Sequence, residues 1–184
     1  MNRKQWLAGL LAGVAIFVWT SIAHMVLPLG EAGIEQIPNE KPLLDKMHET
    51  LGQTSGLYLF PSMEASMEKY AAKLAANPVG VLMYRPPGTR FMTARMLITE
   101  FLVDFIEALL AVFLLTRSRS WGFGGTVGFF ALIGIAVALW TNTSYWNWYG
   151  FPAAYTASYI ATQLIAFVLA GLIAAFMGVG RRAA

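Results

Sequence analysis

The chain of 184 residues contains no cysteine. Disulfide bonds, thiolate metal sites and cysteine nucleophiles are therefore excluded. The sequence also lacks the glycine-rich loops that hold nucleotide phosphates, the GxSxG elbow of serine hydrolases and the HExxH motif of zinc proteases. No catalytic residue can be assigned from such a motif. These absences favour a protein that is not an enzyme.

Charged residues are also scarce. They make up 12% of the chain, against about 25% in a soluble domain, whereas hydrophobic residues make up 57% and the mean hydropathy is +0.56. The formal net charge is +3. The basic residues form no patch but lie near the ends of apolar segments, so we expect no nucleic-acid partner.

Long apolar runs are what the chain has in abundance. There are four of them: Trp6–Leu27, Met92–Thr116, Trp121–Thr141 and Pro152–Gly178. Each reaches the roughly 20 residues that a helix needs to cross a bilayer. The sequence therefore predicts an all-α integral membrane protein, with four transmembrane helices in a bundle. Residues 1–184 would form a single membrane domain whose first partner is the lipid bilayer.

The basic residues also predict the orientation of the spans. They cluster before the first run, between the second and third, and after the fourth: Arg3, Lys4, Arg117, Arg119, Arg181 and Arg182. If the chain alternates across the bilayer, all three clusters share one side, and the positive-inside rule makes that side cytoplasmic. We expect a multi-pass protein of the cell (inner, cytoplasmic) membrane, with both termini cytoplasmic.

The first run has a second interpretation as a secretory signal peptide. Ser21-Ile22-Ala23 resembles a cleavage site, and basic residues precede the run. A signal peptide, however, has an apolar region of about 7–15 residues, and this run is longer. We expect an uncleaved helix.

The segment between the first two runs, Pro28–Phe91, then faces outward. Structureless loops longer than about 12–15 residues are uncommon, so we expect this segment to fold as a partly helical extracytoplasmic lid. Short helices are predicted at about 40–51 and 63–76, and an extended piece at Val81–Tyr84. The lid is not counted as a separate domain.

Three acidic residues interrupt the second run. Glu100, Asp104 and Glu107 are spaced i, i+4, i+7, so in a helix they share one face. An ionised side chain such as Asp costs about 2.5–3.5 kcal/mol at the centre of a spanning helix, and marks a functional site by default. That cost would be relieved by hydrogen bonds from a neighbouring helix, for example from Gln163. A bound cation, a file of water molecules or a basic group of a partner would also relieve it.

His24, near the outer end of the first run, is the basic side chain expected closest to Glu100. Three roles remain open for it. It pairs structurally with a carboxylate, takes part in a proton or cation path, or acts with Glu100 as a metal or haem ligand. Histidine and carboxylates are suitable ligand types for zinc, iron or manganese, but no ExxH spacing supports a metal.

Aromatic and small residues complete the candidate features. The aromatic residues between Trp140 and Tyr159 are typical of a belt at the membrane interface, while Tyr155 and Tyr159, spaced i, i+4, are an alternative pocket for a quinone, a carotenoid or a lipid tail. The pair Gly9 and Gly13 allows close helix packing, either within the chain or with another subunit. The sequence identifies no particular cofactor.

Three functional classes follow. The first is an accessory or interaction subunit of a larger membrane complex, or a homo-oligomer, in which the acids meet a partner's basic group. The second is a proton- or cation-conducting protein that uses Glu100, Asp104 and Glu107. The third is a metal- or haem-bearing protein that uses His24. Since no catalytic motif stands out, the first class is favoured. Glu100, Asp104 and Glu107 are together called the acidic stripe, and the direction in which it points distinguishes the three classes.

Overall fold

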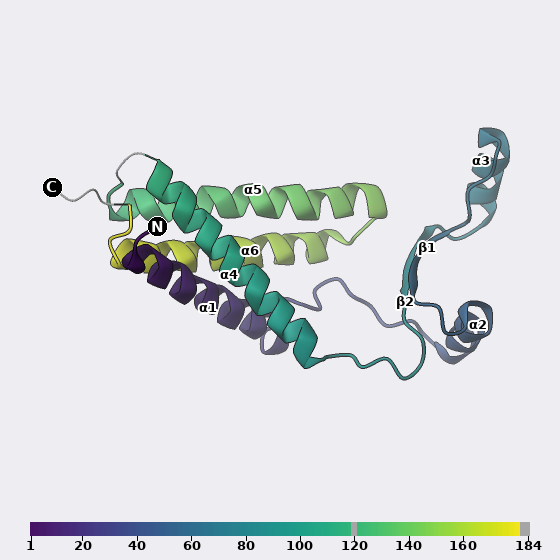
Figure 1. The fold of residues 1–184 in the computed structure, drawn as a ribbon. Helices are drawn as coiled ribbons and strands as arrows, with labels where there is room; N and C mark the ends of the chain where they lie inside the picture. The colour runs from purple at the N-terminus through teal and green to yellow at the C-terminus, as the bar shows by residue number, and fades with distance from the viewer. Residues whose placement is uncertain (119–120, 181–184) are drawn as a thin grey trace. The chain divides into compact units, whose positions relative to one another are not determined.

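The computed structural model describes residues 1–118 and 121–180, and within them it forms six helices and one pair of strands. The chain divides into two units, which are described separately (Figure 1). Met1–Ile34 together with Met92–Ala184 is called the four-helix unit, and Glu35–Phe91 is called the inserted unit. Three of the basic residues used to predict orientation, Arg119, Arg181 and Arg182, lie outside the described residues.

The four-helix unit contains α1 (Arg3–Met25), α4 (Ala94–Arg117), α5 (Phe123–Tyr149) and α6 (Ala153–Phe176). Among the described helices, α1, α5 and α6 are long and apolar enough to cross a membrane, which identifies the chain as a membrane protein. Helix α4 has a similar length of 24 residues. It is less apolar than the other three helices, because every stretch of 18 residues within it contains all three acids of the acidic stripe.

The helix ends follow from local capping. Asn2 begins α1 with a capping box, in which its side chain accepts from the Gln5 N–H and the Gln5 side chain accepts from the Asn2 N–H. Gly150, in the left-handed conformation with φ of 70°, ends α5. The helix continues beyond the predicted span of 121–141, through residues that were expected to form a connection. Within this extension the Asn142 side chain donates to the Ala138 carbonyl one turn earlier.

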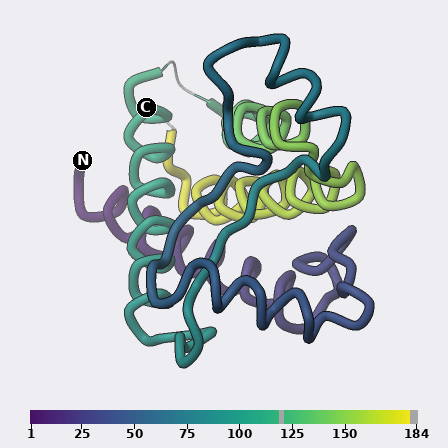
Figure 2. Tube along the Cα trace, turned by 90° about the vertical axis from the view of Figure 1, so that its right-hand side faces the viewer, coloured from purple at the N-terminus to yellow at the C-terminus, as the bar shows by residue number. Residues whose placement is uncertain are grey.

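The helices pack in the order α4, α1, α6, α5, and α4 meets α5 and α6 over only a few residues. Figure 2 shows α4 crossing α1. The two run antiparallel, since Gly9 lies against Leu109 and Gly13 against Phe105. The glycine pair of α1 therefore serves packing within the chain, which was one of the two roles expected for it.

Successive helices alternate in direction, as contacts at both ends of the unit show. At one end the Trp121 N–H donates to the Gly180 carbonyl at 3.1 Å, which joins the start of α5 to the end of α6. A Cβ atom at Gly180 would also contact Leu115, near the end of α4. At the opposite end the Ser158 hydroxyl of α6 donates to the Leu29 carbonyl, just after α1, at 2.7 Å.

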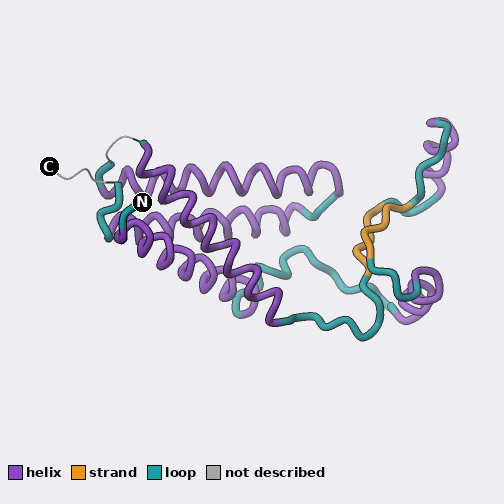
Figure 3. Tube along the Cα trace, in the orientation of Figure 1, coloured by secondary structure: helices purple, strands orange, loops and turns teal. Residues whose placement is uncertain are grey.

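The inserted unit contains α2 (Lys41–Leu51), β1 (Gly56–Phe60), α3 (Met67–Ala76) and β2 (Gly80–Tyr84). The strands pair antiparallel, with Gly56 opposite Tyr84 and Phe60 opposite Gly80. They are the orange segments of Figure 3. Helix α2 lies within the predicted range 40–51 and β2 includes the predicted extended piece. Sequence analysis did not foresee β1.

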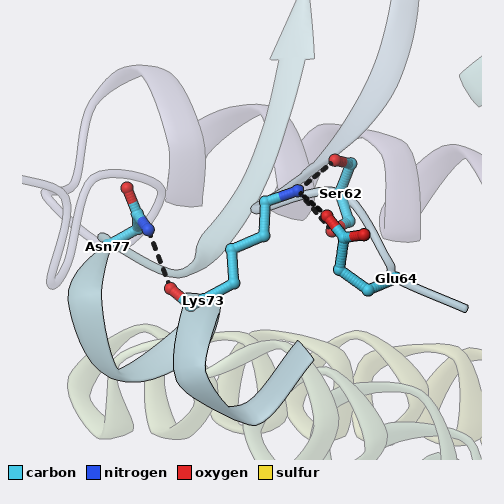
Figure 4. Close-up of polar contacts among 4 residues, drawn as sticks. All are labelled: Ser62, Glu64, Lys73 and Asn77. Atoms are coloured by element: carbon cyan, nitrogen blue, oxygen red, sulfur yellow. Dashed lines mark hydrogen bonds and ion pairs between the residues drawn. The ribbon is translucent and has the colours of Figure 1, made fainter. Parts of the chain in front are cut away.

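Helix α3 begins four residues later than the predicted 63–76 because Lys73 holds the preceding segment as a loop. The Lys73 ammonium donates to the Ser62 carbonyl and hydroxyl at 3.1 and 2.8 Å. It also pairs with the Glu64 carboxylate at 2.7 Å. Asn77 donates in turn to the Lys73 carbonyl at the end of the helix, as Figure 4 shows.

Candidate functional site on helix α4

The three acids of α4 differ in exposure. Asp104 is 5% exposed and lies among the buried residues of the helix with Ala108 and Ala111. Glu107 is half-buried and Glu100 is exposed. The Oδ2 atom of Asp104 has no hydrogen-bond partner among the described residues. The stripe thus runs from an exposed carboxylate to a buried, unpaired one.

The three acids are neighbours on the surface of α4. Glu100 and Glu107 lie four and three residues from Asp104 in the helix, and like charges at this spacing repel. Among the described residues, none of the three forms an ion pair. A counter-charge for the stripe is therefore missing from the part of the chain that the structure describes.

Sequence analysis overlooked one basic residue, Arg95, although it lies inside the predicted run 92–116. It is exposed in the first turn of α4. Nine residues separate it from Asp104, which is about 13 Å along a helix, too far for a direct ion pair. Arg95 is therefore a fourth charged residue near the start of α4, and it does not pair with Asp104.

His24 lies at the end of α1 and is exposed. Its Nδ1 is 2.8 Å from the Thr20 carbonyl oxygen, so the tautomer protonated at Nδ1 donates to that oxygen. Its ring meets Tyr159 edge-on, with centroids 5.2 Å apart. Residues 1–118 and 121–180 contain no ion pair of His24 with a carboxylate, and no group of three or more His, Asp or Glu side chains that could hold a metal.

Tyr155 and Tyr159 stack on each other with their ring centroids 4.2 Å apart. Phe151 meets Tyr155 edge-on at 5.2 Å, and Tyr145 stacks on Phe151 at 5.4 Å. These contacts cover one face of each tyrosine ring, and the pocket expected at Tyr155 and Tyr159 stays a prediction.

Polar groups of α6 form hydrogen bonds to two neighbouring helices. The side-chain oxygen of Gln163 accepts from the Asn142 amide at 2.8 Å, which links α6 to α5. The Thr162 carbonyl accepts from the Trp19 indole N–H at 2.9 Å, which links α6 to α1. Asn142 is the structural residue that sequence analysis missed, since it was placed in a connecting loop.

Carboxylates in this arrangement attract a cation, a proton or a basic side chain, and the exposed Glu100 can be reached from outside the chain. No protein-family model matches the chain, and no curated protein or solved structure is significantly similar to it. The function is therefore inferred from the side chains and their geometry.

Proposed function

We propose that α4 is a fourth membrane-spanning helix and that its acidic stripe binds a basic group of another membrane subunit, which makes the protein an interaction subunit of a larger complex. The observation that carries this proposal is the exposure of Glu100 on a helix that packs mainly against α1. Among the described residues α4 meets α5 and α6 over only a few residues, so much of its remaining surface is exposed.

Apolar side chains surround Glu100 on the exposed surface of α4. Met96, Leu97 and Val103, each one turn from Glu100, are all exposed, which suits contact with lipid or with an apolar partner helix. An ionised acid on the same surface costs about 2.5–3.5 kcal/mol if only lipid covers it. A Lys or Arg from a partner would offset this cost and add a charge-assisted hydrogen bond.

The proposed orientation rests on the alternation of the helices. The start of α1 and the end of α4 lie at the same end of the four-helix unit, because these helices pack antiparallel. Arg3, Lys4 and Arg117 are therefore at that end, which the positive-inside rule assigns to the cytoplasm. Both termini would then be cytoplasmic in the cell membrane, and the inserted unit would be an extracytoplasmic lid.

The test is site-specific photo-crosslinking in the native membrane. A photoreactive amino acid at Val103, one turn from both Glu100 and Glu107, is expected to capture a second polypeptide. Val14, an equally exposed valine on α1, is the matched control and should capture mainly lipid. Glu100→Gln combined with Glu107→Gln should abolish the Val103 product. Identical products at the two valines, or a Val103 product unchanged by the double substitution, would refute the proposal.

The buried Asp104 favours a second candidate, a proton- or cation-conducting protein. An unpaired, buried carboxylate oxygen is a site for a proton or a cation. Proton flux into liposomes that contain only this protein tests this candidate. Flux that disappears in Asp104→Asn would favour conduction over the interaction subunit, whereas liposomes no leakier than protein-free ones would exclude it.

A further inference from the structure

The inserted unit contains a partly open cavity of about 830 Å³ whose walls are almost wholly apolar. Leu43, Met47 and Leu51 of α2 line one side at a spacing of four residues, and Phe60 of β1 and Leu82 of β2 line the other. This volume falls within the range of about 300–1,000 Å³ that is typical of small-molecule sites.

The cavity lies where a folded unit of this size would have its core. All residues of the inserted unit are described, and only Pro61 and Tyr84 are buried. Neither α2 nor α3 contains a buried residue. Apolar walls exposed to water are unfavourable, at about 25 cal/mol per Å². A hydrocarbon ligand in the cavity would supply the missing core.

The charges of the inserted unit help to identify the ligand. The unit has six acidic and six basic residues, so it has no net charge with which to attract a charged macromolecule. Lys46 is the charged residue in the cavity wall, and its ammonium already pairs with Glu49 at 2.9 Å. The ligand is therefore mainly hydrocarbon, with its polar end near Lys46.

The inserted unit is continuous in sequence with a helix of membrane-spanning length. It begins at Glu35, soon after α1 ends at Met25, and the segment before it is held to α6 because Ser158 donates to the Leu29 carbonyl. Both α1 and α6 are long and apolar enough to cross a membrane, so the acyl chains of a bilayer are the abundant hydrocarbon available to this chain.

We infer that the inserted unit binds an acyl chain of a membrane phospholipid in this cavity. The inference goes beyond the interaction proposed for α4 and does not depend on it. The test uses the full chain in phosphatidylcholine nanodiscs, in which a minor fraction of the lipid has a photoreactive diazirine in its acyl chain. After irradiation, mass spectrometry should find adducts in α2, β1 and β2 as well as in the spanning helices.

Two glutamate substitutions on α2 form a matched pair. Met47→Glu places a charge in the cavity wall, whereas Leu44→Glu makes a similar change at an exposed residue outside the wall. Burial of a charge costs well over 1.4 kcal/mol, so Met47→Glu should reduce adducts in the inserted unit by about tenfold or more. Leu44→Glu should leave them unchanged. Adducts in α5 measure the lipid content of every sample.

A cavity-filling variant covers the case in which Met47→Glu unfolds the unit. Leu82→Trp should displace the lipid while hydrogen exchange still shows β1 and β2 paired. No adducts in the inserted unit of the natural chain would overturn the inference, as would adducts in Met47→Glu and Leu82→Trp at the level of the natural chain. Labelling by a free diazirine fatty acid, with none by the diazirine phospholipid, would show that the bound acyl chain does not come from a membrane phospholipid and would overturn the inference.

Discussion

Gly13 of α1 lies directly against the backbone of Phe105 in α4, so that a Cβ atom at residue 13 would be 2.7 Å from the Phe105 Cα. Gly13→Ala must therefore separate the two helices. We expect it to lower the free energy of unfolding by about 1–3 kcal/mol, as overpacking does elsewhere. Reversible unfolding in a denaturing detergent, followed by circular dichroism, measures this change.

Gly128 of α5 provides the control for that prediction, because a Cβ atom there would meet nothing within 4 Å. Gly128→Ala should be neutral or stabilising by up to about 1 kcal/mol, since alanine favours the helix. Equal destabilisation by the two substitutions would show that close packing of α1 on α4 is not the cause.

The hydrogen bond from Asn142 to Gln163 joins α5 to α6 away from the ends of either helix. Replacing both residues in a double-mutant cycle, with Asn142→Ala and Gln163→Ala as the single changes, should give a coupling of about 0.6–1.7 kcal/mol, as for interhelical bonds in other membrane proteins. Asn147→Ala, at an exposed site on the same helix, should show no coupling to Gln163→Ala. A coupling free energy of zero between Asn142→Ala and Gln163→Ala would contradict the hydrogen bond.

Ser158 fixes the segment that leads from α1 to the inserted unit. In Ser158→Ala the Leu29 carbonyl loses its donor, at a cost of about 1 kcal/mol, which corresponds to roughly fivefold faster local opening. Hydrogen exchange at the Ile34 amide, which donates to the Glu31 carbonyl, should report this change. Ser144→Ala, an exposed serine of α5, should leave the same amide unaffected.

Lys73 organises the loop before α3 through Ser62 and Glu64. Because the ion pair is partly exposed, its loss in Lys73→Met should cost about 1 kcal/mol. Cleavage by a glutamate-specific protease after Glu64 should become several times faster, while cleavage after Glu68, inside α3, serves as the internal reference. Lys69→Met, at an exposed site on the same helix, should behave like the natural chain.

The absence of cysteine makes the proposed orientation easy to test with single cysteines. Lys69→Cys in the inserted unit should react with a membrane-impermeant maleimide in intact cells. Gly122→Cys, at the start of α5, should react only after the cells are permeabilised. The opposite pattern would reverse the proposed orientation.

The helices of the four-helix unit were largely predictable, because hydropathy and length are local properties of the chain. The end of α5 was not. Asn142 resembles the start of a polar loop, but it bonds to Ala138 one turn earlier and to Gln163 in another helix. The second partner is 21 residues away, and no local pattern reveals it. Strand β1 escaped prediction for a similar reason, since its run of apolar residues lacks alternation and its partner β2 is distant in sequence.

The acids of the candidate site were found from sequence because charge inside an apolar run is conspicuous. Their different environments could not be predicted. Whether Glu100 is exposed and Asp104 buried depends on which neighbours α4 has, and α4 packs chiefly against α1. The partner of Gln163 was equally hidden from the sequence, since its side-chain oxygen accepts a hydrogen bond from Asn142 on α5.

Helix α5 is longer than a bilayer requires. Its 27 residues extend about 40 Å, against about 30 Å for the hydrocarbon core. Its last two turns contain Tyr145, Trp146, Trp148 and Tyr149, all of them exposed. The apolar part of α5 ends at Trp140, and the polar residues from Thr141 onward suit the head-group layer. The whole helix therefore matches the roughly 40–45 Å of a bilayer with its head groups, and its aromatic end would anchor the four-helix unit at one membrane–water interface.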